Sequence, residues 1–261
     1  MNRTTPLVGM PMDRVDGVAK VTGQARYAGE YPEAGLLHGS VVSSTIARGR
    51  VLKIDSALAT RVPGVIAVLD HRHRPHISGY DDDYSDADSA EGSPFRPLFN
   101  DRVLYSGQPL ALVVADTLQL ARYAGSLINI EYEEEAHQTD LGASPQSHEA
   151  PAETPAPRGD FVAHFAGAPL QVDATYLTAN EHHNPMEPHA STVLYKMDGT
   201  LEIHDKTQGT QNCQDYLHKV FGLPKADIRV RAAFVGGAFG SGLRPQYQLP
   251  LAVMAALHLQ R

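Results

Sequence analysis

The stretch that most constrains this chain is residues 227–243, where a strand pattern runs directly into a loop of glycine and other small residues. Residues 228–235, IRVRAAFV, largely follow the two-residue apolar period of a strand with one buried face. The loop that follows reads GGAFGSG over residues 236–242, and Phe239 is its one large side chain. Glycines at this density allow positive φ angles and let the backbone approach a ligand, so successive N–H groups can converge on an anion.

The two familiar phosphate-binding patterns do not fit this loop. A dinucleotide fingerprint that starts at Gly240 and Gly242 would need glycine or alanine at Pro245. A P-loop would need lysine and then serine or threonine after the last glycine, where Leu243 and Arg244 stand. For the loop alone, a tight turn with no ligand remains an equal alternative.

Composition excludes several classes of function. The chain has 261 residues and is 42% hydrophobic, enough for one large or two ordinary domains. Its net charge is -8, without the basic stripe that nucleic-acid binding needs. Cys213 is the only cysteine, which excludes internal disulfides and any cysteine-rich zinc or iron–sulfur site built by this chain alone.

No targeting or membrane segment is expected. The first residues carry no apolar run behind Arg3, and no window approaches 18 apolar residues. We therefore predict a protein without a membrane span in a reducing cytoplasm. A periplasmic location, reached by export together with a partner, is the alternative.

Turn signals and changes of composition divide the chain into four parts. We predict an extended N-terminal segment at residues 1–30, an α+β domain at 31–142, a linker at 143–159 and a second domain at 160–261. The linker is assigned from its prolines among small polar residues. The first domain is expected to hold the following elements: strands at 35–44, 65–69, 109–115 and 128–132, the third of them apolar on both faces, and helices at 54–61 and 118–127.

The second domain combines short strands with helices. The predicted elements are a short helix at 160–167, strands at 170–177, 191–195, 201–204 and 228–235, and helices at 212–221 and 249–259. Met197-Asp198-Gly199 is typical of a hairpin turn between two of the strands.

Two groups of residues have the chemistry of a metal site. Residues 71–95 hold three histidines beside a run of acidic residues, and His183, Glu187 and His189 are competent zinc ligands. Charge runs without apolar periodicity are usually solvated loops, which is the favoured interpretation of the first group. In the second, Pro185 and Pro188 prevent the regular helix of an HExxH site, which argues against a helical zinc site. If Glu187 is buried, it must be hydrogen-bonded.

Four motifs in this chain resemble those of the molybdenum-binding subunit of the xanthine dehydrogenase and aldehyde oxidoreductase family. The first has the form R-x-DG-x-x-K-x-TG-x-A-x-Y and spans Arg14 to Tyr27; the second, Y-x-GQP-x-A-x-VVA, starts at Tyr105. The third, H-x-x-MEPHA, starts at His183. The fourth joins Thr207-Gln208, a helix and a strand to the glycine loop at 236–242.

This resemblance implies a fold and a cofactor. The fold is α+β: an N-terminal hammerhead-like α+β domain followed by the first, incomplete part of the α+β molybdopterin-binding domain. The cofactor is molybdenum-molybdopterin, for which the resemblance also allows the cytosine dinucleotide form. By position, Gln208 would hydrogen-bond a terminal ligand of the molybdenum, Phe239 would pack against the cofactor, and Gly237, Ala238 and Gly240 would contact it through their backbone. Without the resemblance, a helix cap would be the better interpretation of Gln208.

The resemblance also implies a reaction and partners. Members hydroxylate aldehydes or N-heterocycles with oxygen from water, and pass electrons to iron–sulfur clusters and FAD, here expected on an iron–sulfur subunit and an FAD subunit. The family's general base is a glutamate far toward the C-terminus, so we expect it beyond residue 261, on the remaining C-terminal part of the molybdenum subunit, and we expect this chain to be inactive alone. Leu243 stands where purine oxidisers carry glutamate, which favours an aldehyde-type substrate and places Leu243 in the substrate pocket. The alternative is a non-catalytic, degenerate relative that acts as a binding or assembly module.

Overall fold

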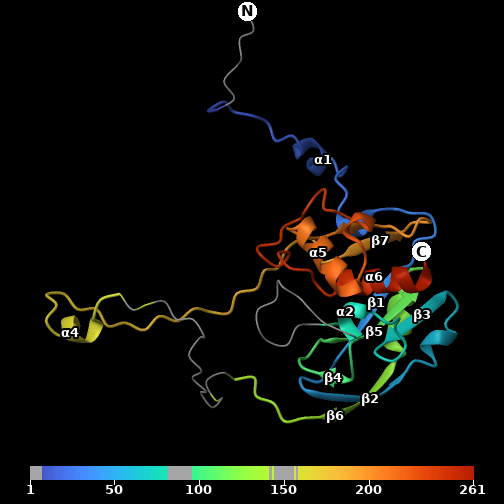
Figure 1. The fold of residues 1–261 in the computed structure, drawn as a ribbon, viewed down its shortest axis with the longest axis horizontal. Helices are drawn as coiled ribbons and strands as arrows, with labels where there is room; N and C mark the ends of the chain where they lie inside the picture. Colours follow the sequence, from blue (N-terminus) through green and yellow to red (C-terminus); the bar gives the residue numbers. More distant parts are fainter. Residues whose placement is uncertain (1–7, 82–95, 141–142, 144–155, 157) are drawn as a thin grey trace, which may run out of the picture. The chain divides into compact units, whose positions relative to one another are not determined.

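The computed structural model describes residues 8–81, 96–140, 143, 156 and 158–261. The chain divides into two compact units, one formed by Met1–Ala136 together with His183–Arg261, and the other by His137–His182. The larger unit contains three small sheets and is drawn in Figure 1. Among the described residues, no helix combines the length and the apolar content needed to cross a bilayer.

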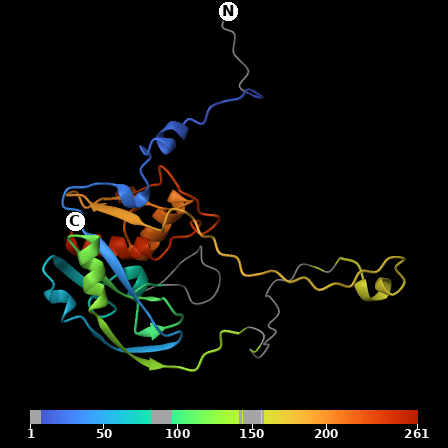
Figure 2. The same ribbon diagram turned by 180° about the vertical axis from the view of Figure 1, so that it is seen from behind.

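The first sheet has the order β1-β5-β3 and is antiparallel throughout. Its strands are β1 (His38–Ser43), β5 (Pro109–Ala115) and β3 (Val65–Asp70). The central strand β5 is buried along its whole length, which confirms the prediction of a strand apolar on both faces. Leu112 and Val114 join the main core, whereas Val113 and Ala115 pack on the opposite face with α3 (Leu118–Ser126). Figure 2 shows α3, in green, beside β1.

The second sheet has the order β4-β2-β6. Its strands are β4 (Arg102–Val103), β2 (Gly49–Asp55) and β6 (Asn129–Glu134). The helix predicted at 54–61 is wrong, because β2 continues to Asp55, where it pairs with Asn129 of β6. The side chain of Asp55 accepts a hydrogen bond from the backbone N–H of Ala57 (3.1 Å), and only the short 3₁₀ helix η2 (Ala59–Arg61) follows.

The third sheet has the order β7-β8-β9 and positions the glycine loop. Strand β7 (Ser191–Tyr195) is antiparallel to β8 (Leu201–Asp205), whereas β9 (Ile228–Arg231) is parallel to β8. A parallel pair needs a crossover, which here includes α5 (Thr210–Phe221) and the short η4 (Lys225–Asp227). Because β8 and β9 are parallel, the segments that follow their carboxyl ends emerge at the same edge of the sheet. Strand β9 is shorter than the predicted 228–235, since the chain leaves the ladder after Arg231.

One hydrophobic core joins the first and third sheets. The apolar helix α6 (Gln248–Leu259) and the buried face of α5 pack into it, and α6 confirms the predicted helix at 249–259. The fully buried members with large side chains are Leu69, Leu201, Ile203, Leu217, Ile228, Leu249, Leu251 and Met254.

Short elements complete the larger unit. The short helix α1 (Gly17–Val21) corrects the prediction of an extended segment at residues 1–30, and η1 (Ala28–Glu30) follows it. The helix α2 (Ser78–Asp81) is held by Arg74, whose guanidinium pairs with Asp81. Residues 78–81 thus form a short helix where a solvated loop was predicted, whereas residues 71–77 contain no helix or strand. The rest of the predicted His/Asp-rich loop, residues 82–95, lies outside the described residues.

The smaller unit, His137–His182, contains the helix α4 (Phe161–Phe165), capped by the side chain of Asp160, which accepts a hydrogen bond from the N–H of Ala163 (2.9 Å). The strand predicted at 170–177 is wrong: these residues have no regular structure. A strand needs a neighbour to pair with, and the described part of this unit contains no other strand. Most of the predicted linker, 143–159, lies outside the described residues, so its boundaries stay a prediction.

Candidate functional site

The structure brings Gln208 and the glycine loop together. The side-chain Oε1 of Gln208 accepts hydrogen bonds from the N–H groups of Gly240 (3.1 Å) and Gly242 (3.3 Å). The backbone N–H of Gln208 donates to the carbonyl of Gly242 (2.8 Å). The helix-cap interpretation of Gln208 is therefore wrong, since α5 begins after Gly209 and no side chain caps it.

These contacts fix the orientation of the Gln208 amide. A glutamine side chain has one acceptor oxygen and one donor NH₂ group, and the loop occupies the oxygen. The Nε2 group makes no hydrogen bond within the described part of the chain, and the side chain is exposed. The Nε2 group of Gln208 is thus available as a donor to a ligand bound at the loop.

The loop itself offers further donors. In the part of the chain that the structure describes, the backbone N–H groups of Gly237, Ala238 and Phe239 have no acceptor. Gly240 has a φ of 101°, in the region that favours glycine, so the turn after Phe239 depends on that residue type. Consecutive unpaired N–H groups in such a turn are typical of an anion-binding backbone.

Phe239 occupies a strained conformation on the surface. Its φ is 55° and its side chain is 74% exposed, so it gains little from burial. A bulky residue with positive φ costs on the order of 1–3 kcal/mol, and such outliers cluster at functional sites. The strained conformation and the exposure of the ring together make this loop a candidate contact surface.

The H-x-x-MEPHA segment anchors the start of the loop through Glu187. Its Oε2 accepts a hydrogen bond from the N–H of Gly236 (2.7 Å), and its Oε1 accepts one from the N–H of Ala28 (3.4 Å). A Cβ at position 236 would lie 2.7 Å from the Cβ of Glu187, so only glycine allows this approach. The carboxylate therefore holds two backbone segments together. Among the described residues, no three acidic, histidine or cysteine side chains are placed to hold a metal ion.

A row of buried polar residues lies behind the loop. His204, Asp205, Lys206 and Thr207 are all nearly inaccessible to solvent. Thr207 Oγ1 donates to the carbonyl of Gly242 (3.2 Å) and accepts from the N–H of Gly209 (3.0 Å). Sequence reasoning missed this row, although charged residues directly after an apolar strand were the available signal.

Asp205 is the acid of this row, and it is 2% exposed. Its carboxylate accepts hydrogen bonds from the hydroxyl of Ser191 and from Nε2 of Gln248 (3.4 Å). The thiol of Cys213 lies 3.6 Å from its second oxygen. Burial raises the pKa of Asp205 above its usual value despite these donors.

Leu243 lies at the end of the loop with 55% of its side chain exposed. Its N–H donates to the carbonyl of Gly240 (3.2 Å), and its own carbonyl accepts from Nδ2 of Asn212 (3.5 Å). The backbone is thus held while the side chain is free to contact another molecule.

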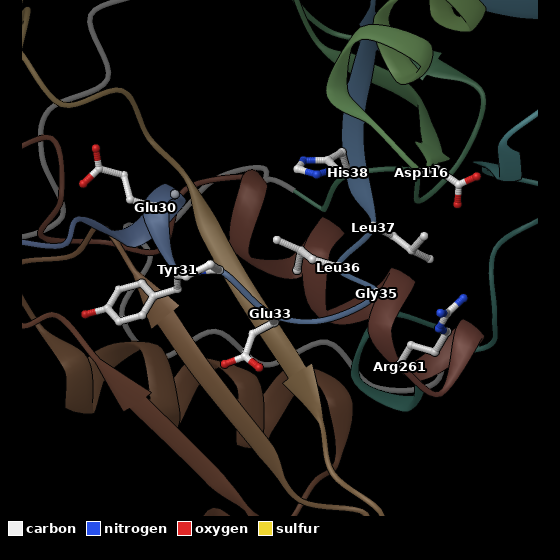
Figure 3. Close-up of a pocket in the computed structure, with 11 residues that line it drawn as sticks. Glu30, Tyr31, Glu33, Gly35, Leu36, Leu37, His38, Asp116 and Arg261 are labelled. Atoms are coloured by element: carbon white, nitrogen blue, oxygen red, sulfur yellow. The ribbon is translucent and has the colours of Figure 1, made fainter.

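A cavity of about 600 Å³ lies elsewhere on the larger unit and is shown in Figure 3. Its lining includes Glu30 and Tyr31 on one side and Asp116 and Arg261 on the other. It shares no lining residue with the loop, so it is separate from the site that Gln208 forms.

Comparison with known proteins matches both parts of this architecture. A model of the a/b hammerhead domain of aldehyde oxidase and xanthine dehydrogenase matches residues 22–136, and a model of the molybdopterin cofactor-binding domain matches residues 145–261. The chain belongs to the aldehyde oxidase and xanthine dehydrogenase family. The predicted fold class, a hammerhead domain followed by part of a molybdopterin-binding domain, is confirmed.

Family members of several kinds are similar to this chain. The aldehyde oxidoreductase molybdenum-binding subunit PaoC of Escherichia coli is 34% identical over 260 residues, which cover 98% of this chain and 34% of that protein. The 6-hydroxypseudooxynicotine dehydrogenase complex subunit gamma of Paenarthrobacter nicotinovorans is 30% identical, with 89% of this chain and 31% of that protein covered. The present chain therefore spans about a third of the length of these relatives.

Solved structures of two oxidoreductases also superpose on nearly the whole of this chain. Quinoline 2-oxidoreductase from Pseudomonas putida 86 superposes with a TM-score of 0.83 at 25% identity, over 97% of this chain and 34% of that one. Aldehyde oxidoreductase from Desulfovibrio gigas superposes with a TM-score of 0.77 at 25% identity, over 95% of this chain and 29% of that one.

Proposed function

We propose that this chain forms the cofactor-contacting part of a molybdenum hydroxylase that oxidises aldehydes or N-heterocycles. The observation that carries the proposal is the pairing of Gln208 with the glycine loop, which leaves one amide donor and a run of backbone donors without acceptors in the described chain. Relatives named as aldehyde oxidoreductase and xanthine dehydrogenase molybdenum-binding subunits support it.

The residues at the loop fit a pterin-type cofactor. The group is anionic and rich in acceptors, and the loop offers N–H donors from Gly237, Ala238 and Phe239 that have no acceptor in the described chain. When bound, molybdenum-molybdopterin, in its simple or cytosine dinucleotide form, supplies the oxidation itself: an aldehyde and water become a carboxylic acid, two protons and two electrons.

Each residue then has a role in binding and orientation. Gln208 donates from Nε2 to an oxygen at the metal end of the cofactor, while Oε1 keeps the loop in place. Gly237, Ala238 and Gly240 bring the backbone close to the cofactor, and the Phe239 ring packs against its face. Leu243 lines the substrate pocket, where an apolar side chain suits an aldehyde better than a purine.

The complete reaction needs groups that this proposal places outside residues 1–261. They are a general base, supplied by the remaining part of the molybdenum subunit, and iron–sulfur and FAD subunits that carry the two electrons away. One relative is named as a subunit of a complex, which agrees with such an assembly. A cytoplasmic location, and inactivity of this chain alone, stay predictions.

A pair of substitutions at Gln208 tests the proposal. Gln208→Glu keeps carboxylate oxygens for the Gly240 and Gly242 N–H groups but removes the Nε2 donor. Gln208→Ala removes both functions. In the whole protein purified with its natural partners, we expect molybdenum and pterin per folded molecule, or turnover of the retained fraction, to fall about 5- to 150-fold in Gln208→Glu, as for a lost hydrogen bond of about 1–3 kcal/mol.

The matched control is Gln119→Glu, an exposed glutamine on α3 that lies outside the loop. It should retain wild-type metal content and turnover. A wild-type protein without molybdenum and pterin would contradict the proposal and favour the non-catalytic binding or assembly module. Wild-type behaviour of Gln208→Glu would remove Gln208 from the site.

A further inference from the structure

Lys206 is a fully buried cation behind the glycine loop. Its side chain is 1% exposed, and it lies two residues before Gln208, in the segment that follows β8. Its Nζ is 3.5 Å from Oγ of Ser241 in the loop and 3.5 Å from Nε2 of His189. The loop is thus in contact with a buried ammonium group on its inner side.

The positive charge of Lys206 is not neutralised by a direct ion pair within the described part of the chain. Glu187 and Asp205 are the acids that act on it electrostatically. The carboxylate of Glu187 is engaged by backbone N–H groups, and that of Asp205 by the hydroxyl of Ser191. Burial lowers the pKa of Lys206, although the charges of Glu187 and Asp205 act in the opposite direction. An ammonium buried without an ion-pair partner is costly, and that cost is reduced when an anion approaches.

The neighbours of Lys206 have fixed hydrogen-bonding roles. An ammonium only donates, so His189 must accept at Nε2 and carry its proton on Nδ1. Burial and the charge of Lys206 lower the pKa of His189, which agrees with a neutral ring. The Nδ1 atom is buried and has no partner among the described residues. His189 therefore cannot neutralise the cation.

Ser241 connects the cation to the backbone of the loop. Its hydroxyl accepts from Lys206 and donates to the carbonyl of Ala238 (2.8 Å), which also accepts from the N–H of Ser241 (2.9 Å). In a trans peptide the C=O and the following N–H point in opposite directions. Because the Ala238 carbonyl is held toward Ser241, the N–H of Phe239 points the other way, out of the loop.

We propose that Lys206 is a positioning residue that, through Ser241, holds the Ala238–Phe239 peptide with its N–H outward and gives the loop a positive potential for an anionic group of the cofactor. This inference rests on the proposed function. It explains why a charge is kept in a place where an apolar side chain would fold more easily.

The test compares Lys206→Met with Ser241→Ala in the whole protein purified with its natural partners. Methionine keeps most of the length of the side chain and removes its charge. We expect Lys206→Met to retain about tenfold less molybdenum and pterin after dialysis, with an unchanged or higher melting temperature. The retained fraction should show a lower reduction potential of the molybdenum centre, since removal of a nearby positive charge favours the oxidised state. Ser241→Ala keeps the cation, so it should lower retention less and leave the potential unchanged.

Lys219→Met, at an exposed position of α5, is the matched control and should behave as wild type. Wild-type retention and potential in Lys206→Met would overturn the inference while leaving the proposed function intact, whereas a wild-type protein without molybdenum would overturn the proposed function. If Lys206→Met lowers both the melting temperature and the amount of retained cofactor, the Ser241→Ala variant decides. Lower cofactor retention by Ser241→Ala at an unchanged melting temperature supports the inference, and wild-type cofactor retention overturns it.

Discussion

The strand β5 and the end of strand β8 show two different ways of burying a chain. Every residue of β5 from Pro109 to Ala115 is buried, and all of them are apolar. At the end of β8, the buried residues are His204, Asp205, Lys206 and Thr207, with exposures of 7%, 2%, 1% and 3%. The first arrangement gains free energy from each residue that leaves water, whereas the second needs a hydrogen bond for each.

The difference follows from what surrounds each segment. Strand β5 lies between α3 and the main core, so both of its faces meet apolar side chains. The end of β8 is enclosed by elements that each contribute a polar or aromatic partner: Tyr31 stacks on His204 with ring centroids 3.5 Å apart, and Gln248 of α6 reaches Asp205. Lys206 and Thr207 contact the loop at Ser241 and Gly242, so two of these four polar residues support it directly.

The largest effect on stability is expected in the main hydrophobic core, which includes part of β5. Leu69 of β3 is 1% exposed in the main core, and Leu69→Ala should lower the free energy of unfolding by about 2–5 kcal/mol through lost burial and a cavity. Urea denaturation measures it. Leu52→Ala, at a position 54% exposed on β2, is the control and should change stability by less than about 0.5 kcal/mol. A loss below about 1 kcal/mol at Leu69 would mean that the sheet is less tightly packed than its burial indicates.

The next largest effect on stability is expected at Glu187, which connects the loop to the N-terminal segment. Glu187→Ala leaves the N–H groups of Gly236 and Ala28 without their acceptor, and we expect a loss of about 1–3 kcal/mol. Hydrogen exchange at these two amides should become faster, while amides of β5 are unchanged. Glu187→Gln keeps one acceptor oxygen and should lose less. Equal exchange in both variants and wild type would show that the carboxylate does not hold the loop.

A smaller, pH-dependent effect is expected at Asp205. Burial raises its pKa above the usual 3.8, so the folded protein binds a proton more readily than the unfolded chain. The contribution of this group to stability is therefore fully present below pH 3.8 and is lost as pH rises through the raised pKa. Asp205→Asn removes this titration. The free energy of unfolding of wild type minus that of the variant should fall as pH rises from 3.8 toward neutrality. A difference that rises with pH would contradict the assigned direction.

Local patterns predicted the apolar elements of the fold, and failed where tertiary contacts decide. The β5, α3 and α6 segments follow from runs and periods of apolar residues that any burial would select. The predicted helix at 54–61 was wrong because pairing with β6 extends β2 to Asp55. The predicted strand at 170–177 was wrong because a strand is defined by its partner, which no local pattern contains.

The candidate site could be predicted in part. Gln208 and Phe239 were selected by the resemblance to a family, and their hydrogen-bonded segments meet because β8 and β9 are parallel neighbours. Lys206 was not predicted, since a lysine next to a threonine and a glutamine is usually at the surface. Its burial depends on Ser241 and His189, which approach it only in the folded chain. The cofactor roles of Gln208, Gly237, Ala238, Phe239, Gly240 and Leu243 stay predictions.

The smallest effect on stability is expected at Cys213, which lies on α5 next to Asp205 and Thr207. Its thiol is inaccessible to solvent, and burial raises its pKa to about 12. It lies 3.3 Å from Oγ1 of Thr207 and 3.6 Å from Oδ2 of Asp205, both weak contacts for sulfur. Cys213→Ala should therefore lower the free energy of unfolding by no more than about 1 kcal/mol, because it removes one sulfur atom and one weak S–H donor shared between two acceptors.

Thiol labelling provides the independent measurement. In the folded protein, a thiol with a pKa of about 12 and no solvent contact should not react with a disulfide reagent over minutes, whereas the unfolded chain should react completely. Asp205→Asn provides the comparison, since it changes a neighbour of the sulfur without exposing it. Rapid labelling of the folded wild type would mean that the end of β8 opens easily. The row of buried polar groups would then be a mobile edge rather than a fixed support for the loop.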